Sequence, residues 1–292
     1  MPHKWRGPTD RHFMLRVPGR WLLWPMVFLV GCAGLFQGSL RPVEEEQGRL
    51  VLEALRQKEE TINTLRGLFQ ASISGSGIPL SQNLQGMFSY ERPDVLHLTG
   101  FIRLGVPVMD FHREGNQYEL YFPAEGKVVT GRVNETKEGA QWDQTVMLSI
   151  RAMDAVLGKI TGLSSAGVRV WKNDERYRID MEAGQSSHLS AQDDFTVRTW
   201  VDAQTLELTS IEYRRSFDDI VVSVECEDYR EVRSQTSGEF SSVRLPFLVR
   251  AMDHRTRGGT MTLHFQEFIV NAAKETVHEG FHNRRVWSQR RG

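Results

Sequence analysis

A His-Glu-x-x-His pattern near the C-terminus, His278-Glu279-Gly280-Phe281-His282, has the spacing of a zinc-binding catalytic motif. In zinc hydrolases two histidines on one helix face bind Zn²⁺, and the glutamate beside the first acts as general base. Here Gly280 lies inside the required helix, at a cost of about 1 kcal/mol relative to alanine. None of the ten residues after His282 is a histidine, aspartate or glutamate that could complete the site. We therefore keep a zinc hydrolase only as a remote alternative and interpret the segment as a surface extension.

Other patterns that carry catalytic chemistry are incomplete in this sequence. The segment SISGSGIP has serines among glycines without the G-x-S-x-G spacing of a nucleophile elbow, and GLSSAG only approaches it. The pairs Asp193-Asp194 and Asp218-Asp219 fall in predicted loop or hairpin positions, where aspartate usually forms turns. Glycine-rich phosphate loops and Cys-x-x-Cys pairs are absent. We therefore predict a protein without catalytic residues, metal ligands or a dissociable cofactor.

Cys32 is the residue at which we expect a covalent modification. It lies in an apolar run, Trp21–Phe36, that is shorter than the roughly 20 residues of a membrane span. Five basic residues and one acidic residue precede this run, which is the layout of an export signal. The sequence Leu29-Val30-Gly31-Cys32 resembles the bacterial lipobox, which implies that residues 1–31 are removed and that Cys32 carries a lipid anchor of three acyl chains. The alternative is an ordinary signal peptide or anchor in which Cys32 is incidental.

The overall charge argues against nucleic acid as a partner. The chain has 36 basic and 37 acidic residues; residues 1–31 hold five and one of them, so the mature protein has 31 and 36, a net charge of −5. A mildly acidic protein has no general electrostatic reason to bind nucleic acid. Four arginines gather in residues 283–292, which we interpret as a solvated basic tail. With Cys32 lipidated, Cys226 has no disulfide partner.

Two segments have the apolar spacing of helices. The first helix is predicted over residues 45–65, where the apolar residues at helical spacing are Val51, Leu55, Ile62 and Leu65. The second is predicted within residues 142–162, ending near Gly158 or Gly162. Its apolar residues at helical spacing are Val146, Ile150, Met153 and Leu157. Both helices are predicted to be amphipathic.

The rest of the chain has a two-residue apolar period in about eleven short segments, separated by Gly, Pro, Asn and Asp. Many short strands at regular spacing favour a barrel or a strongly curved sheet, because closure or coverage protects the sheet edges. We predict a mainly β (α+β) protein, an incomplete antiparallel barrel with amphipathic helices covering its open side. The predicted organisation is a removed signal in 1–31, a lipidated cysteine and tether in 32–44, the half-barrel in 45–282 and the basic tail in 283–292.

Three strand segments resemble the LolA/LolB superfamily of periplasmic lipoprotein carriers and outer-membrane lipoprotein receptors. They are MFSYERPDVLHL (87–98), with its Pro-Asp corner; RTWVDAQTLELTSIEYR (198–214), similar to the family's W-x-D hairpin; and MTLHFQEFIVN (261–271), similar to its last strand. Phe281 resembles a phenylalanine that is often found beyond the last strand in this family. The resemblance implies an incomplete antiparallel barrel of about eleven strands, lidded by helices around an apolar cavity that accommodates acyl chains.

Two sets of residues are the site candidates. Apolar residues on alternating strand positions could line the implied cavity, or could fill a packed core: Met109, Phe111, Tyr118, Leu120 and Phe122. The receptors of the family carry a protruding loop with an exposed leucine that assists membrane insertion of cargo. The matching residues here are Leu104, Gly105, Val106 and Pro107, for which a buried hairpin turn is the alternative.

These features together predict a bacterial envelope lipoprotein that binds acyl chains and receives or transfers lipids or lipoproteins. The lipobox favours the receptor side of the family, because the soluble carriers lack a lipid anchor. Ala33 resembles the signal for the outer membrane, so we expect an anchor there, facing the periplasm, with a periplasmic carrier or envelope protein as partner. The alternatives are a scaffold lipoprotein that does not transport and, remotely, the hydrolase of His278 and His282.

Overall fold

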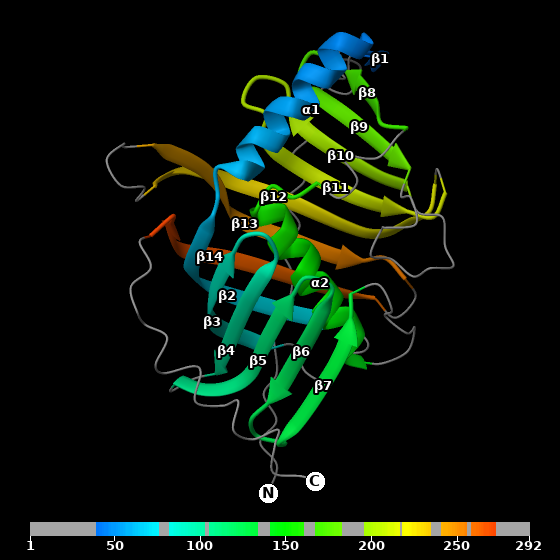
Figure 1. Ribbon diagram of the computed structural model, residues 1–292. Helices are drawn as coiled ribbons and strands as arrows, with labels where there is room; N and C mark the ends of the chain where they lie inside the picture. Colours follow the sequence, from blue (N-terminus) through cyan, green and yellow to red (C-terminus); the bar gives the residue numbers. More distant parts are fainter. Residues whose placement is uncertain are drawn as a thin grey trace, which may run out of the picture. The chain divides into compact units, whose positions relative to one another are not determined.

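Segments with a two-residue apolar period form the strands of one antiparallel sheet (Figure 1). The computed structural model describes residues 39–75, 82–102, 105–133, 141–160, 167–182, 196–216, 218–234, 241–255 and 258–272. In chain order the strands are β1 (Arg41–Pro42), β2 (Thr64–Gly75), β3 (Gln82–Glu91), β4 (Val95–Ile102), β5 (Val106–Glu114), β6 (Gln117–Phe122), β7 (Lys127–Arg132), β8 (Arg169–Lys172), β9 (Arg176–Glu182), β10 (Thr196–Asp202), β11 (Leu208–Arg214), β12 (Ile220–Arg233), β13 (Ser242–Asp253) and β14 (Gly259–Val270). The two helices are α1 (Glu45–Glu60) and α2 (Gln141–Val156).

The sheet is open, and in its middle a strand from the start of the described chain pairs with a strand from its end. The strand order is β1-β8-β9-β10-β11-β12-β13-β14-β2-β3-β4-β5-β6-β7, so β1 and β7 are the edges. The last strand, β14, pairs with the first long strand, β2. The predicted mainly β fold, an incomplete antiparallel barrel with helices, is confirmed. The described residues form fourteen strands rather than about eleven, and β1 falls in the segment predicted as a tether.

The helix predicted over residues 45–65 ends earlier, at Glu60. Its last backbone bonds run from the N–H of Ile62 to the carbonyl of Glu59 and from Thr61 to Lys58. Beyond them, Leu65 belongs to β2, where it is fully buried and begins an alternation of inward and outward side chains. The prediction was wrong at this end because Leu65 fits helical spacing, while its backbone pairs with Val270 of β14 and Tyr90 of β3.

Helix α2 lies across the inner side of the sheet, against β12, β13 and β14 (Figure 1). It ends at Val156, two residues before Gly158, which is one of the two predicted ends and has a φ of 67°. Every side chain from Thr145 to Leu157 is buried, so the polar residues of this helix lie in the interior with the apolar ones. No helix among the described residues is long and apolar enough to span a membrane.

Phenylalanines from the central strands form an aromatic cluster on the inner face of the sheet. Its members, linked by ring centroid distances of 4.8–6.4 Å, are Phe69, Phe88, Phe247, Phe265 and Phe268. Two glycines make room for these rings on neighbouring strands. A Cβ atom on Gly86 would lie 2.3 Å from Phe69, and one on Gly67 would lie 2.6 Å from Phe88. The glycines therefore allow large rings to cover the backbone.

The segment that resembles the W-x-D hairpin forms the turn between β10 and β11. The Asp202 carboxylate accepts hydrogen bonds from the backbone N–H groups of Gln204 at 2.9 Å and Thr205 at 2.8 Å. The bonds from Thr205 and Gln204 hold the pKa of Asp202 below its ordinary value. Lys58, near the end of α1, donates to the carbonyl of Thr205. This hairpin therefore carries one of the contacts that fix α1 on the sheet.

Candidate functional site

The residues proposed to line a cavity lie together on β5 and β6. Phe111, Tyr118, Leu120 and Phe122 are buried in the same hydrophobic core as α2, and Met109 is half-buried at its margin. The rings of Phe111 and Tyr118 stack with centroids 6.2 Å apart. The structure thus places all five side chains in or against the core. Their contact with a lipid stays a prediction.

An ion pair ties α2 to β5 inside the half-barrel. The Arg113 guanidinium donates to the Asp154 carboxylate over 3.1 Å, and both side chains are buried. Arg113 also donates to the carbonyl of Gly115, at 3.0 Å, in the β5–β6 turn. A buried charge is tolerated when it has an opposite charge and hydrogen bonds, and both are present here. This pair fixes the C-terminal half of α2 relative to the β5–β6 hairpin.

Lys159, just after α2, holds the turn between β3 and β4. Its ammonium group donates to the Asp94 carboxylate at 2.6 Å and to the carbonyl of Pro93 at 2.8 Å, and lies 4.6 Å from the centroid of the Tyr90 ring. Burial alone would lower the pKa of Lys159, but the hydrogen bond to Asp94 and the charge of Asp154 outweigh it, so the pKa is raised. The Pro-Asp corner of the predicted strand pair is therefore the attachment point of α2.

Arg151 of α2 has a different environment. Its side chain is 1 % exposed, and its guanidinium carbon lies 4.4 Å from the centroid of the Tyr213 ring on β11. Within the described ranges, none of its three nitrogens has a hydrogen-bond partner. The sequence did not single out this residue, because a charge within the helical apolar pattern is usually solvated. One feature of the sequence could have indicated that Arg151 is buried: Ile150 and Ala152, an apolar and a small residue, flank it within an apolar helix.

The hairpin between β4 and β5 carries exposed apolar side chains. Ile102 and Val106 pair across its tip and are 44 % and 51 % exposed. Gly105 has a φ of 72°, the left-handed conformation that glycine adopts without strain. Val106 and Pro107 belong to β5, and Leu104 lies outside the described residues. The described part of this candidate loop is thus an apolar surface, and its role in membrane insertion stays a prediction.

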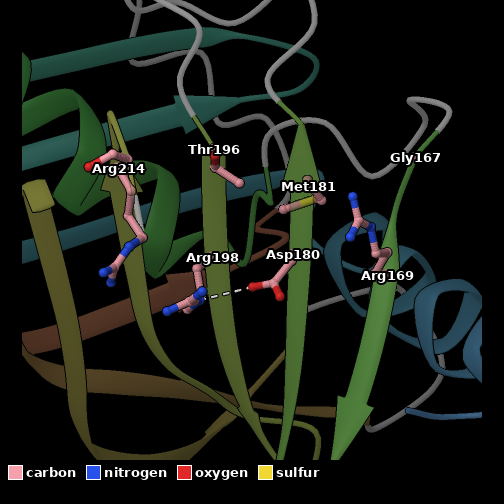
Figure 2. Close-up of a pocket in the computed structure, with 8 residues that line it drawn as sticks. Gly167, Arg169, Asp180, Met181, Thr196, Arg198 and Arg214 are labelled. Carbon is pink, nitrogen blue, oxygen red and sulfur yellow. Dashed lines mark hydrogen bonds and ion pairs between the residues drawn. The ribbon is translucent and has the colours of Figure 1, made fainter. Parts of the chain in front are cut away.

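A pocket of about 240 Å³ lies at the end of β8 to β11 (Figure 2). Its lining includes Arg169, Arg198 and Arg214 with a single acidic residue, Asp180. Figure 2 shows Arg198 pointing across to Asp180, to which it donates at 2.9 Å. The described lining is therefore rich in positive charge. The sequence did not predict this pocket, because the residues that line it come from four separate strands.

Several predicted residues lie outside the part of the chain that the structure describes: Cys32, Leu104, His278, His282 and the tail 283–292. Within the described ranges, no three His, Cys, Asp or Glu side chains are grouped so that they could hold a metal ion. The one cysteine described, Cys226, is buried in β12, and burial raises the pKa of its thiol to about 12. This thiol is therefore protonated and unreactive at neutral pH.

Solved structures share this arrangement of strands and helices. A domain described as an outer-membrane lipoprotein-sorting protein, from Vibrio parahaemolyticus, superposes with a TM-score of 0.53 at 10 % identity, over 79 % of this chain and 95 % of its own. The chain has a LolA/LolB-like fold. A DUF1329 family protein from Desulfovibrio piger gives a TM-score of 0.50 at 13 % identity, over 79 % of this chain and 94 % of its own.

A LolA superfamily protein from Nitrosomonas europaea gives a TM-score of 0.46 at 10 % identity, over 76 % of this chain and 94 % of its own. Neither a family model nor a curated protein matches the sequence. The LolA/LolB-like fold agrees with the family resemblance of the three strand segments, which lie in β3–β4, β10–β11 and β14. At these identities the likeness concerns the fold.

Proposed function

We propose that this protein is a membrane-anchored lipoprotein of the bacterial envelope whose half-barrel binds acyl chains and receives or transfers lipids or lipoproteins. The observation that carries the proposal is the inner face of the open sheet, where the phenylalanine cluster, the β5–β6 residues and the buried apolar residues within 145–156 of α2 belong to one hydrophobic core. The LolA/LolB-like fold supports the same reading.

Acyl chains would bind by replacing contacts between α2 and the sheet. Apolar contacts are non-directional, so a chain that takes the place of aliphatic or aromatic side chains keeps most of the buried apolar area. The free-energy difference between the empty and the loaded state is then small. A small difference is what a carrier or receptor needs in order both to accept its cargo and to release it.

The anchor and the β4–β5 hairpin would act at the membrane. In this proposal, lipidated Cys32 holds the domain near the bilayer through the tether. The exposed side chains of Ile102 and Val106, with Leu104 beside them in sequence, would then contact the apolar layer during transfer. Outer-membrane location follows the resemblance of Ala33 to a sorting signal and is part of the proposal.

The test is uptake of a fluorescent fatty-acyl probe by the full chain and by two methionine variants. Met109→Gln places an amide at the margin of the inner core, and we expect roughly tenfold weaker uptake, because an acyl chain cannot hydrogen-bond the amide. Met252→Gln is the matched control, since Met252 is 43 % exposed on β13. If the wild-type protein takes up no probe, the proposal is wrong and the scaffold alternative is favoured.

A further inference from the structure

Among the residues that the structure describes, Arg151 is an interior cation with neither an ion pair nor a hydrogen bond. Its side chain is 1 % exposed, and Nε, Nη1 and Nη2 all lack a hydrogen-bond partner. A guanidinium group has five N–H donors, and it keeps its charge in proteins because its pKa is above 12. Unlike a buried lysine or carboxylic acid, it cannot escape the cost of burial by becoming neutral. Such a group needs an anion or another strong acceptor.

The other buried charges of the described residues do have opposite charges beside them. Arg113 has Asp154, and Asp253 accepts from Arg255 at 2.7 Å. Arg214 donates to Glu212. The nearest carboxylate along α2 from Arg151 is Asp154, which is already bonded to Arg113. The interior between α2 and β11 therefore has a positive charge in excess.

A second buried polar group without a partner among the described residues lies on β10, which pairs with the strand that carries Tyr213. Thr199 of β10 is fully buried, and its hydroxyl has no hydrogen-bond partner. On β10, Val197 pairs with Tyr213, whose ring contacts Arg151. Thr199 lies two residues further along β10, on the same face of the sheet, and pairs with Ile211. A guanidinium from α2 and a hydroxyl from β10 thus lie in the interior beside the β11 residues Tyr213 and Ile211, respectively. Oxygen anions are the ligands that such donors bind best.

We propose that Arg151 binds the negatively charged group, a carboxylate or a phosphate, of an amphipathic lipid whose chain lies on the apolar inner face. This rests on the proposed function, because it takes the ligand to be a lipid and names its headgroup class. Contact with the Tyr213 ring stabilises the cation through its charge and leaves the N–H donors for the anion. The site is closed in this conformation, so entry requires movement of α2 or its neighbours.

The experiment compares 11-(dansylamino)undecanoic acid with its methyl ester, which has the same chain and no charge. Both probes are titrated into the full chain, into R151M, which keeps the length of the side chain, and into R250M. Arg250 is a matched control, because it is exposed on β13 and paired with Glu227. We expect the wild type and R250M to bind the acid at least tenfold more tightly than the ester, and R151M to bind both with the affinity of the ester.

The outcomes separate this proposal from the proposed function. Equal binding of acid and ester by the wild type overturns the role of Arg151 and leaves acyl-chain binding intact, whereas binding of neither probe overturns both. Undecyl phosphate as a competitor decides between carboxylate and phosphate as the preferred group. If inorganic phosphate alone, at a matched concentration, displaces the acid equally well, the site binds a free anion and the lipid assignment is wrong.

Thermal unfolding without ligand provides the folding control. Replacing an unpaired buried cation by methionine removes an uncompensated charge, so we expect R151M to unfold at a higher temperature than the wild type. The acid should raise the unfolding temperature of the wild type and leave that of R151M unchanged. A lower unfolding temperature for ligand-free R151M would mean that Arg151 is paired within the folded protein, which contradicts the proposal.

Discussion

At the residue scale, Asn271 joins the end of the last strand to the start of the domain. Its side-chain oxygen accepts hydrogen bonds from the backbone N–H groups of Asn63 at 2.8 Å and Thr64 at 3.1 Å, and its amide donates to the carbonyl of Thr61 at 2.7 Å. It also has a φ of 51°, a conformation that asparagine tolerates better than most residues. One side chain thus satisfies the backbone groups that the end of α1 and the start of β2 leave free.

We expect Asn271→Ala to lower the free energy of unfolding by about 2–3 kcal/mol, because two backbone donors and one acceptor lose their partner. Chemical denaturation of the full chain measures this change. Asn271→Gly is the control, since glycine accepts the same φ but makes no side-chain hydrogen bonds. A glycine variant as stable as the wild type would show that the hydrogen bonds contribute nothing.

At the element scale, α2 is held at its C-terminal end by charged side chains and elsewhere by apolar packing. Lys159 bonds to Asp94, which precedes β4 in the sequence. Asp154 bonds to Arg113, which follows β4 in the sequence and belongs to β5. The rest of the helix lies against β12 to β14. In the proposed function, entry of a ligand requires movement of α2, and these charged contacts are the ones that release of its C-terminal end would break.

The attachment by Lys159 predicts a pH dependence. Because the folded-state pKa of Lys159 is raised above its ordinary value of 10.5, its contribution is fully present below pH 10.5 and is lost as the pH rises through the folded-state pKa. We expect Lys159→Met to lower the free energy of unfolding by about 1 kcal/mol at pH 8. The difference from the wild type should shrink above pH 10.5. Lys127→Met, at an exposed position on β7, is the control; a difference that is constant with pH would contradict the assignment.

Two glycine substitutions should have opposite effects on stability. A Cβ atom on Gly86 would lie 2.3 Å from the Phe69 ring, so we expect Gly86→Ala to destabilise the protein by about 1–3 kcal/mol through overpacking. Gly48 lies within α1, where a Cβ atom would be 3.5 Å from Val170, an ordinary contact. We expect Gly48→Ala to stabilise by about 0.5–1 kcal/mol, because alanine favours the helix. Unfolding curves of the two variants measure both changes, and equal effects would refute this account.

At the scale of the whole molecule, the sheet is built from strands far apart in the chain. Pairing of β14 with β2 brings Val270 beside Leu65, and β8 to β11 continue the same sheet on the other side of β12. The inner face is therefore assembled from both halves of the domain. The core and any ligand site on it form only when the long-range pairs are made.

In the proposed function, Cys32 anchors the protein to the membrane. We expect the wild-type chain, expressed in a bacterium, to sediment with membranes and to have a mass that lacks residues 1–31 and carries three acyl chains. Cys32→Ser should abolish the acylation and the cut before residue 32. A Cys226→Ser variant, at the other cysteine, is the control and should retain the acylation. Membrane association and processing that survive Cys32→Ser would contradict the lipobox reading.

The sequence by itself determined most of the strands, the position of α2 and the fold class, because a two-residue apolar period and a helical period are local signals. The hairpin at Asp202 and the end of the last strand at Asn271 were indicated by the resemblance of segments 198–214 and 261–271 to the LolA/LolB superfamily. The sequence misplaced the end of α1, because the helical spacing of apolar residues continues past Thr61 and Asn63. The backbone groups of these two residues bond to Asn271, more than 200 positions away.

Only the tertiary structure decided what surrounds α2. Its sequence predicts one apolar face, and burial of its polar residues follows from the strands that enclose it, which come from distant parts of the chain. For the same reason the isolation of Arg151, the ion pair of Arg113 with Asp154 and the arginine-lined pocket of β8 to β11 could not be predicted. Burial and charge pairing are properties of the assembled interior, because the desolvation of a group and its distance from an opposite charge depend on residues that are remote in the sequence.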